Sequence, residues 1–356
     1  GLGACLLRNG GIVWEGYYGY ADMEEKKALK SDTIYQLASL SKTFTATALM
    51  QLYEKDLFRL DADVSDYLPF EVRNPNFPDT PITFRLLLTH TAGFADVGSN
   101  GNRFGSKFPL GVRGDSPIPL GEFVAQVFTP GGKYYAPDLF STEKPGTRYE
   151  YSNISFSLIG YLVETISGLD FSDYCKDNIF KPLEMNDTGW HLRDVDVERT
   201  AFSYVRAASD TVSYRKVRHF GLPGYPEGML RTTTHDLAGF VTMFMNGGIF
   251  NGRRILRPET VDLMLSPQHI KNIPSRSFPV IDIGLTWLIN DVEGERLCSM
   301  NGFSGAIHTN ALFSRENGTG IIYYLTGINM QNMPATIEVT KKLHQALRTV
   351  NQGSTE

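Results

Sequence analysis

The stretch Ala38-Ser39-Leu40-Ser41-Lys42-Thr43-Phe44-Thr45-Ala46 places a Ser-x-x-Lys pattern at the head of an apolar run that continues to Tyr53. The run predicts a helix from about Ser39 to Lys55, and residues three apart on a helix share a face. The Ser39 hydroxyl and the Lys42 amine should therefore point to the same side. Serine is a weak nucleophile until a neighbouring group accepts its proton, and a lysine whose pKa is lowered by burial can do so. The pattern predicts nucleophilic catalysis by Ser39.

Ser-x-x-Lys alone is a weak pattern, because the chain contains it three times. Ser141 and Lys144 lie in a loop rich in glycine and proline, and Ser213 and Lys216 lie in a polar stretch. We interpret both pairs as solvated loop residues. Ser39 has a structural interpretation as well, the N-cap of its helix. Its position before an apolar helix favours the catalytic interpretation.

The composition narrows the classes of protein to which the chain can belong. Its 356 residues suffice for one large domain or two lobes, and a hydrophobic fraction of 42% can build the core. The net charge of −5 gives no electrostatic basis for binding nucleic acid or an anionic membrane. No run of about 18 apolar residues occurs, so no membrane-spanning helix is predicted.

Cysteine and histidine usage argues against metal or disulfide chemistry. Cys5, Cys175 and Cys298 are widely spaced, which excludes a disulfide framework and a cysteine-rich zinc site but leaves one bridge open. The seven histidines form no His-Glu-x-x-His or similar ligand cluster. We expect no metal and no other cofactor. The chain opens directly on a predicted strand after Gly1, as a trimmed or processed start would.

Predicted strands gather at both ends of the chain, with helices between them. The predicted strands are Ala4–Leu7, Ile12–Tyr18, Ile281–Asn290, Arg296–Asn301, Ile307–Ser314 and Gly320–Leu325. The predicted helices besides the one at Ser39 are Phe84–His90, Ile154–Ile166, Phe171–Ile179, His235–Asn246, Pro258–Leu265 and Pro334–Thr349.

This order of elements predicts an α/β (α+β) fold, in which one antiparallel sheet from both chain termini is flanked by helices. Residues 1–58 and 270–356 would form the sheet lobe. Residues 59–269 would form a mostly helical lobe inserted between them. A cleft between two lobes is the natural place for a ligand, so we expect the active site there.

Tyr151-Ser152-Asn153 supplies two further candidate residues. Tyr151 can act as a phenolate base only if positive charge holds its pKa below about 10, and Lys42 is the obvious source of that charge. The alternative is an ordinary half-buried tyrosine. Asn153 could donate its amide to a substrate carbonyl or hold Lys42 in place, and its alternative is a turn or helix-cap asparagine.

The segment Met300-Asn301-Gly302-Phe303-Ser304-Gly305 is the next candidate. Gly302 would let a substrate backbone approach closely, and the Phe303 N–H could join the Ser39 N–H as an oxyanion hole. The alternative is a plain hairpin turn. The same segment nearly matches the Gly-x-Ser-x-Gly nucleophile elbow at Ser304.

The elbow would need an acid and then a histidine downstream, and only Glu316 or Glu338 before His344 could supply them. An elbow joins a strand to a helix, whereas both flanks of Ser304 read as strands. We therefore favour Ser39 over Ser304 as the nucleophile.

Taken in order, these motifs give the chain a resemblance to a known family. Over about residues 3–350 it resembles the class C β-lactamases and penicillin-binding-protein-like serine hydrolases. The resemblance is carried by Ala38–Thr43, Leu86–Gly93, Pro145-Gly146, Tyr151–Asn153, Gly228–Leu230 and Asp236-Leu237. It implies the two-lobed fold, Ser39 as nucleophile, Lys42 and Tyr151 as the general-base pair, and Asn153 as a substrate-positioning amide. It also favours export to the periplasm or out of the cell.

One departure from the family pattern bears on the substrate. The third family motif begins with lysine in the lactamases and often with histidine or tryptophan in the esterases, whereas this chain has Met300. Methionine brings no positive charge for a substrate carboxylate. This argues against β-lactams and D-Ala-D-Ala peptides and fits a neutral ester or amide. We expect Met300, Gly302 and Phe303 to contact substrate. Arg231 and His308, on the next strand, are further side chains that could reach the pocket, although for His308 we favour the interpretation of an ordinary histidine in a hairpin strand.

The predicted function is therefore a serine hydrolase that forms an acyl-enzyme on Ser39 and acts on a small ester, amide or peptide. A carboxylesterase or amidase is expected first, and a β-lactamase or D-amino-acid peptidase second. Acyl transfer to an acceptor other than water comes third. The alternative of another class is a catalytically silent binding or scaffold protein with the same fold.

Overall fold

The computed structural model describes residues 1–96, 110–206, 213–274, 279–292, 294–304, 306–327 and 333–349. Its central feature is a seven-stranded antiparallel sheet with the strand order β13-β14-β15-β16-β17-β1-β2. The strands of this sheet are β1 Leu2–Arg8, β2 Gly11–Tyr18, β13 Val280–Ile283, β14 Leu288–Val292, β15 Glu295–Ser304, β16 Ile307–Ser314 and β17 Thr319–Thr326. The first and last strands of the chain, β1 and β17, pair side by side, which confirms the predicted sheet from both termini.

One predicted strand was wrong. The stretch predicted as a single strand, Ile281–Asn290, is a hairpin of β13 and β14. Its turn is closed by a hydrogen bond from Gly284 N to the Trp287 carbonyl at 2.7 Å, and Thr286 has a φ of +85°. A residue with positive φ ends an extended run, which the apolar sequence of this stretch conceals.

The remaining strands are short and form two-stranded pairs. These pairs are β3 Tyr20–Asp22 with β4 Lys27–Ala28, β5 Tyr35–Gln36 with β10 Arg231–Thr232, β6 Val112–Arg113 with β9 Phe220–Gly221, β7 Ser203–Arg206 with β8 Tyr214–Val217, and β11 Ile249–Phe250 with β12 Arg253–Arg254.

The α-helices are α1 Lys42–Tyr53, α2 Phe84–Leu88, α4 Leu120–Phe128, α5 Ile154–Ser167, α6 Phe171–Cys175, α7 Thr234–Met245, α8 Pro258–Leu265 and α9 Met333–Thr349. All the predicted helices are present with small shifts in their bounds, and α6 is shorter because it continues into a π-helical turn at Lys176–Phe180. Sequence reasoning missed α4. Its buried residues Leu120, Phe123, Val124, Val127 and Phe128 follow helical spacing, so the signal was present.

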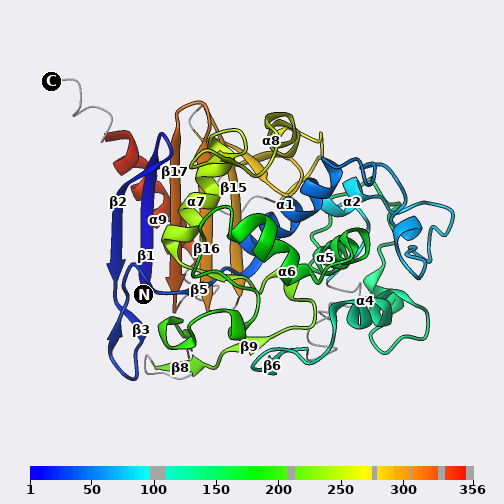
Figure 1. Cartoon of the computed structure of the whole chain (residues 1–356), viewed down its shortest axis with the longest axis horizontal. Helices are drawn as coiled ribbons and strands as arrows, with labels where there is room; N and C mark the ends of the chain where they lie inside the picture. Colours follow the sequence, from blue (N-terminus) through cyan, green and yellow to red (C-terminus); the bar gives the residue numbers. More distant parts are fainter. Residues whose placement is uncertain are drawn as a thin grey trace.

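The two faces of the sheet carry different layers (Figure 1). Side chains alternate between the faces: Ala4 and Leu6 of β1 pack in a small cluster with Leu347 of α9, whereas Cys5 and Leu7 belong to the main core. Helix α7 contacts β1, β16 and β17 and lies across the face opposite α9 in Figure 1.

Helix α1 is the centre of the main core. Ten of its twelve residues are buried, and they include Lys42 and three threonines besides six apolar side chains. Phe44 of α1 stacks on Phe240 of α7 with ring centroids 3.6 Å apart, and α1 also packs against α5. The start of α1 therefore lies between the sheet and helix α5 (Figure 1). The division into lobes at residues 58/59 and 269/270 stays a prediction.

Among the helices that the structure describes, no single one is long and apolar enough to cross a membrane. By length and composition alone, α5 together with Phe171–Phe180 would qualify as a pair, with an 80° bend between the two parts.

Candidate active site

A strained turn positions Ser39. The residues predicted as the first turn of the helix form instead a 3-10 turn, η1 Ala38–Ser41, and α1 begins only at Lys42. Ala38 has a φ of +49°, a conformation that costs a residue with a Cβ of order 1–3 kcal/mol. In a 3-10 helix, side chains at i and i+3 are eclipsed. Lys42 Nζ accordingly lies 3.1 Å from Ser39 Oγ, as the sequence pattern predicted.

Lys42 is enclosed by hydrogen-bond partners. Its side chain is fully buried, and Nζ donates to Asn153 Oδ1 at 2.6 Å and to the Glu227 carbonyl oxygen at 2.5 Å, besides the contact with Ser39. Burial lowers the pKa of the Lys42 ammonium from 10.5 to about 8, while the negative charges of Glu227 and Asp96 oppose this shift. The neutral amine is therefore accessible near physiological pH.

Tyr151 contacts the same Ser39 oxygen as Lys42. Its hydroxyl donates to Ser39 Oγ at 2.6 Å, and Lys42 Nζ lies 5.2 Å from the centre of its ring. Tyr151 lies two residues before Asn153, which occupies the N-cap position of α5. The structure thus brings together Ser39, Lys42, Tyr151 and Asn153, four residues that the sequence predicted as site residues.

Two half-buried carboxyl groups border this cluster, and sequence reasoning missed both. Asp96 accepts the Asn153 N–H at 2.8 and 3.0 Å, and burial raises the pKa of its carboxyl group. Burial raises the pKa of the Glu227 carboxyl to about 7, and Glu227 Oε2 accepts from Ser157 Oγ at 2.8 Å. Glu227 lies beside Gly228, at the edge of a quoted motif, which was the only available signal.

The segment 300–304 lies on β15, beside the turn that carries Ser39. A Cβ on Gly302 would stand 3.0 Å from the Ser39 nitrogen. Met300 is 4% exposed in the main core and, by strand alternation, lies on the same face as Gly302. The Phe303 side chain falls on the opposite face, so Phe303 can serve this site only through its backbone.

The structure directs His308 and Arg231 elsewhere. His308 packs on Tyr323, with ring centroids 5.5 Å apart, and Tyr323 belongs to the cluster formed with α9. The buried Arg231 guanidinium donates to the carbonyl oxygens of Phe220, Met229 and Trp190 at 2.7 to 3.2 Å. Neither side chain contributes a polar contact to Ser39 or Lys42.

The partners that the rival serines would need are exposed or paired with other residues. Ser304 ends β15, and the histidine that an elbow there would use, His344, lies 3.3 Å from Glu295 instead. Gly305 lies outside the described residues. The other two lysines of the Ser-x-x-Lys pattern are also accounted for, since Lys144 is exposed and Lys216 pairs with Asp22.

Among the residues that the structure describes, no three His, Cys, Asp or Glu side chains lie close enough together to hold a metal ion.

Comparison of the sequence with known protein families identifies the family of this chain. A model of the beta-lactamase family matches residues 1–339, so the chain belongs to the beta-lactamase family. The resemblance stated from the motifs is confirmed.

Individual relatives support the same placement. Penicillin-binding protein 4* of Bacillus subtilis is 32% identical over 208 residues, which are 57% of this chain and 42% of that protein. The chain spans less than half the length of the curated relatives it matches. Among solved structures, D-amino acid amidase from Ochrobactrum anthropi gives a TM-score of 0.77 at 22% identity, covering 98% of this chain and 94% of its own. EstCE1, described as a hydrolase with promiscuous acyltransferase activity, gives 0.71 at 19% identity, covering 94% and 92%. These likenesses confirm the predicted fold.

Proposed function

We propose that the protein is a serine hydrolase that forms an acyl-enzyme on Ser39. One observation carries this proposal: Ser39 Oγ lies within hydrogen-bond distance of both Lys42 Nζ, at 3.1 Å, and the Tyr151 hydroxyl, at 2.6 Å. A serine bonded to two groups that can exchange protons has the arrangement that nucleophilic catalysis requires. Family membership supports the same reaction class.

The hydrogen-bond partners of Lys42 indicate that its amine accepts the proton of Ser39. Two of the three partners of Nζ, Asn153 Oδ1 and the Glu227 carbonyl oxygen, can only accept hydrogen bonds. A neutral amine has two N–H groups and one lone pair, so it satisfies both acceptors and turns the lone pair towards Ser39. The pKa of about 8 makes this neutral form available. Lys42 is then the base that takes the Ser39 proton.

The remaining steps use the other residues of the cluster. Ser39 Oγ attacks the carbonyl carbon as its proton passes to Lys42, and the N–H groups of Ser39 and Phe303 stabilise the oxyanion. The Tyr151 hydroxyl passes a proton to the leaving group, is reprotonated from Lys42, and the C–O or C–N bond breaks. Water then attacks the ester on Ser39 with the proton transfers reversed, releasing the acid and free Ser39.

A neutral ester or amide is the proposed substrate class. Met300 supplies no positive charge, and the Arg231 guanidinium is held by three backbone carbonyls. A substrate carboxylate would therefore lack a cationic partner at either position, and an unpaired buried charge is costly. We rank carboxylesterase or amidase activity first, with the substrate bound between the two predicted lobes. The solved D-amino acid amidase and EstCE1 make this ranking reasonable, and β-lactamase or D-amino-acid peptidase activity is the second candidate because of the family itself.

The proposal is tested by active-site labelling. A fluorophosphonate probe should modify Ser39, as located by mass spectrometry, and Ser39→Ala should abolish both labelling and hydrolysis of nitrophenyl butyrate while the protein stays folded. Ser304→Ala and Ser141→Ala are the matched serine controls and should label normally. Absence of labelling and of turnover on esters, amides and nitrocefin would instead support a silent binding protein.

A further inference from the structure

His90, at the end of α2, is held in an unusual conformation. It follows α2 within the quoted motif Leu86–Gly93 and has a φ of +56°, although its side chain is only 1% exposed. A bulky residue in the left-handed region costs free energy that surrounding contacts must offset. No step of the proposed reaction uses His90 directly, so the contacts made by this strained residue require an explanation.

His90 accepts hydrogen bonds from the backbone on both sides of Tyr151. Its carbonyl oxygen accepts the Glu150 N–H at 2.7 Å, and its Nδ1 accepts the Ser152 N–H at 3.1 Å. The backbone amides before and after the tyrosine are therefore bonded to one residue. Rotation or translation of the segment 150–152 would break one of these two bonds.

The imidazole also supports the phenol ring directly. The rings of His90 and Tyr151 stack with centroids 4.5 Å apart and planes 29° from parallel, and Phe156 of α5 lies 5.1 Å from the imidazole. The Tyr151 ring thus rests on a wall formed by His90, with its hydroxyl directed at Ser39.

The charge state of His90 is fixed by its surroundings. Burial and the nearby positive charge of Lys42 lower the pKa of His90 to about 3. The imidazole is therefore neutral at ordinary pH, and because Nδ1 accepts the Ser152 N–H, the ring proton lies on Nε2. A neutral ring leaves the electrostatics around Lys42 undisturbed while it holds Tyr151.

We propose that His90 is the positioning residue of Tyr151: its backbone oxygen, Nδ1 and ring together hold the phenol at hydrogen-bond distance from Ser39. Asp96 extends the same arrangement by one residue, because its carboxylate accepts the Asn153 N–H. The turn 90–96 is thus a template for the segment 150–153. The kinetic part of this inference rests on the proposed function, whereas its geometric part does not.

Two substitutions separate the two side-chain contacts. His90→Asn places an oxygen where Nδ1 stood and tolerates the positive φ, but it removes the stacked ring. His90→Phe keeps a ring and removes the acceptor for the Ser152 N–H. Both variants should lose kcat by about 10- to 100-fold with little change in KM, since a misplacement of about 1 Å has effects of that size. His219→Asn is the matched control, because His219 is a partly buried histidine stacked on Phe202, and its kcat should be unchanged.

A double-mutant cycle distinguishes positioning of Tyr151 from a general loss of structure. If His90 acts through Tyr151, His90→Asn should lower kcat in the wild-type background and have little further effect in Tyr151→Phe. Equal losses in both backgrounds would overturn the proposal, as would kcat values within about twofold of wild type in both His90 variants.

A crystal structure of His90→Asn tests the geometry independently of turnover. The distance from the Tyr151 hydroxyl to Ser39 Oγ should increase beyond hydrogen-bond range. A distance unchanged from 2.6 Å would overturn the positioning role whether or not a substrate is known. Inactivity of the wild-type protein, by contrast, would count against the proposed function alone.

Discussion

Gly302 of β15 lies directly against Ser39: a Cβ on residue 302 would stand 3.0 Å from the Ser39 nitrogen, within 2.5 Å of Thr309 Oγ1, and would overlap the Leu37 carbonyl oxygen. Thr309 Oγ1 in turn donates to the Leu37 carbonyl at 2.6 Å. The turn carrying the candidate nucleophile therefore sits on the sheet where only a hydrogen atom fits. This contact explains how the sheet and the start of α1, far apart in sequence, form one site.

Gly302→Ala should push this turn away from β15. Because the Leu37 and Ser39 backbone atoms would have to move, we expect kcat to fall by about 100-fold through misalignment of the nucleophile and the oxyanion donors. Gly11→Ala on β2 is the control, since a Cβ there meets only the Arg8 carbonyl oxygen at an ordinary 3.7 Å. Normal kcat in a folded Gly302→Ala protein would remove β15 from the proposed site.

Lys42→Arg should abolish turnover. Arginine keeps the positive charge but cannot accept a proton at accessible pH, so a loss of several orders of magnitude in kcat is expected if Lys42 is the base. Tyr151→Phe removes the hydroxyl that lies 2.6 Å from Ser39 Oγ and should also be severely impaired. The measurement is kcat and KM on nitrophenyl esters. Near-normal rates in both variants would mean that the proton leaves Ser39 by another route.

The sequence predicted the site where local geometry or a motif encodes it. Ser39 and Lys42 are three residues apart at the start of a helix, so their proximity follows from helical spacing alone. Tyr151 and Asn153 were candidates because of their side-chain chemistry, and the family resemblance then assigned their roles. Most helices could also be predicted from local sequence, because the spacing of apolar residues indicates which helix face is buried.

Other features depend on contacts between distant segments and could not be predicted. The positive φ of Ala38 has no signature in a residue that normally avoids that conformation. Asp96 and Glu227 meet Lys42 only after the chain has folded, and either would pass for a surface acid in the sequence. The break between β13 and β14 was hidden because its residues are as apolar as those of the strands beside it.

The charge of Glu227 should influence the pH dependence of kcat/KM through the pKa of Lys42. The reaction requires neutral Lys42, so kcat/KM should rise with pH through the lysine pKa of about 8. The negative charge of Glu227 raises the Lys42 pKa. Removing that charge in Glu227→Gln should therefore lower it and shift the acidic limb of the pH profile to lower pH. The shift is measured from kcat/KM between about pH 5 and 10.

Glu164→Gln provides the control for this experiment. Burial also raises the pKa of Glu164 to about 7, but its carboxylate accepts the Phe171 N–H at 3.1 Å and is not among the charges acting on Lys42. Its acidic limb should coincide with that of the wild type. A limb that stays in place in Glu227→Gln, or moves to higher pH, would show that Lys42 is not the titrating base.

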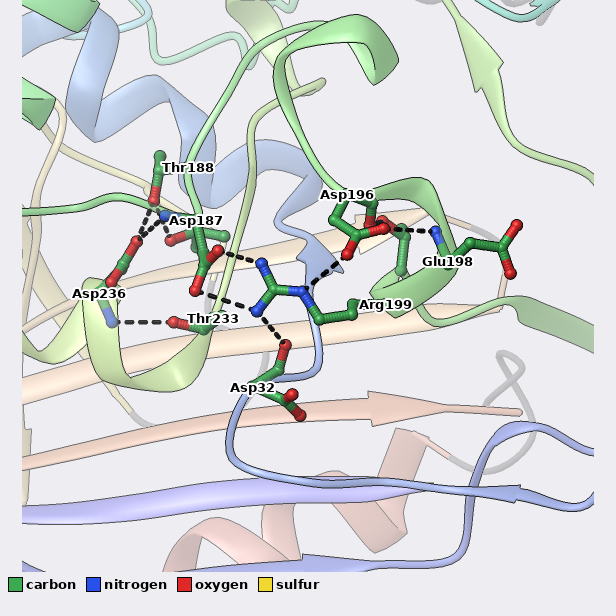
Figure 2. A network of polar contacts seen from close by, with 10 residues as sticks. Asp32, Asp187, Thr188, Asp196, Glu198, Arg199, Thr233 and Asp236 are labelled. Atoms are coloured by element: carbon green, nitrogen blue, oxygen red, sulfur yellow. Dashed lines mark hydrogen bonds and ion pairs between the residues drawn. The ribbon is translucent and has the colours of Figure 1, made fainter.

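Arg199 should contribute to stability by joining separate segments of the chain (Figure 2). Its guanidinium forms an ion pair with Asp187, donates to Asp196 Oδ2 at 3.1 Å and reaches the Asp32 carbonyl at 3.4 Å. Asp187 is itself tied to α7, because its N–H donates to Asp236 at 2.9 Å. Since the Arg199 and Asp187 side chains are about a third exposed, solvent screening limits the effect. Arg199→Ala should lower the free energy of unfolding by about 1–2 kcal/mol.

Chemical denaturation monitored by tryptophan fluorescence gives this free energy. Arg199→Lys should recover only part of the loss, because lysine lacks the planar fork that meets Asp187 at two oxygens. The control is Arg193→Ala. The Arg193 side chain is 63% exposed and its Nε lies 3.9 Å from Asp194 Oδ1, so this substitution should leave the free energy of unfolding nearly unchanged. Equal stability of Arg199→Ala and Arg193→Ala would contradict a structural role for the network.

Met300 should set the preference between neutral and carboxylate-bearing substrates. We expect the wild-type protein to cleave short neutral esters with a higher kcat/KM than nitrocefin or D-Ala-D-Ala peptides. Met300→Lys should shift the ratio towards the carboxylate substrates by roughly 1–3 kcal/mol, the range of a charge-assisted hydrogen bond. Because Met300 is only 4% exposed, the lysine should also reduce stability. Met300→Leu controls for altered packing and should leave the ratio unchanged. A wild-type preference for nitrocefin over nitrophenyl butyrate would disprove this role of Met300.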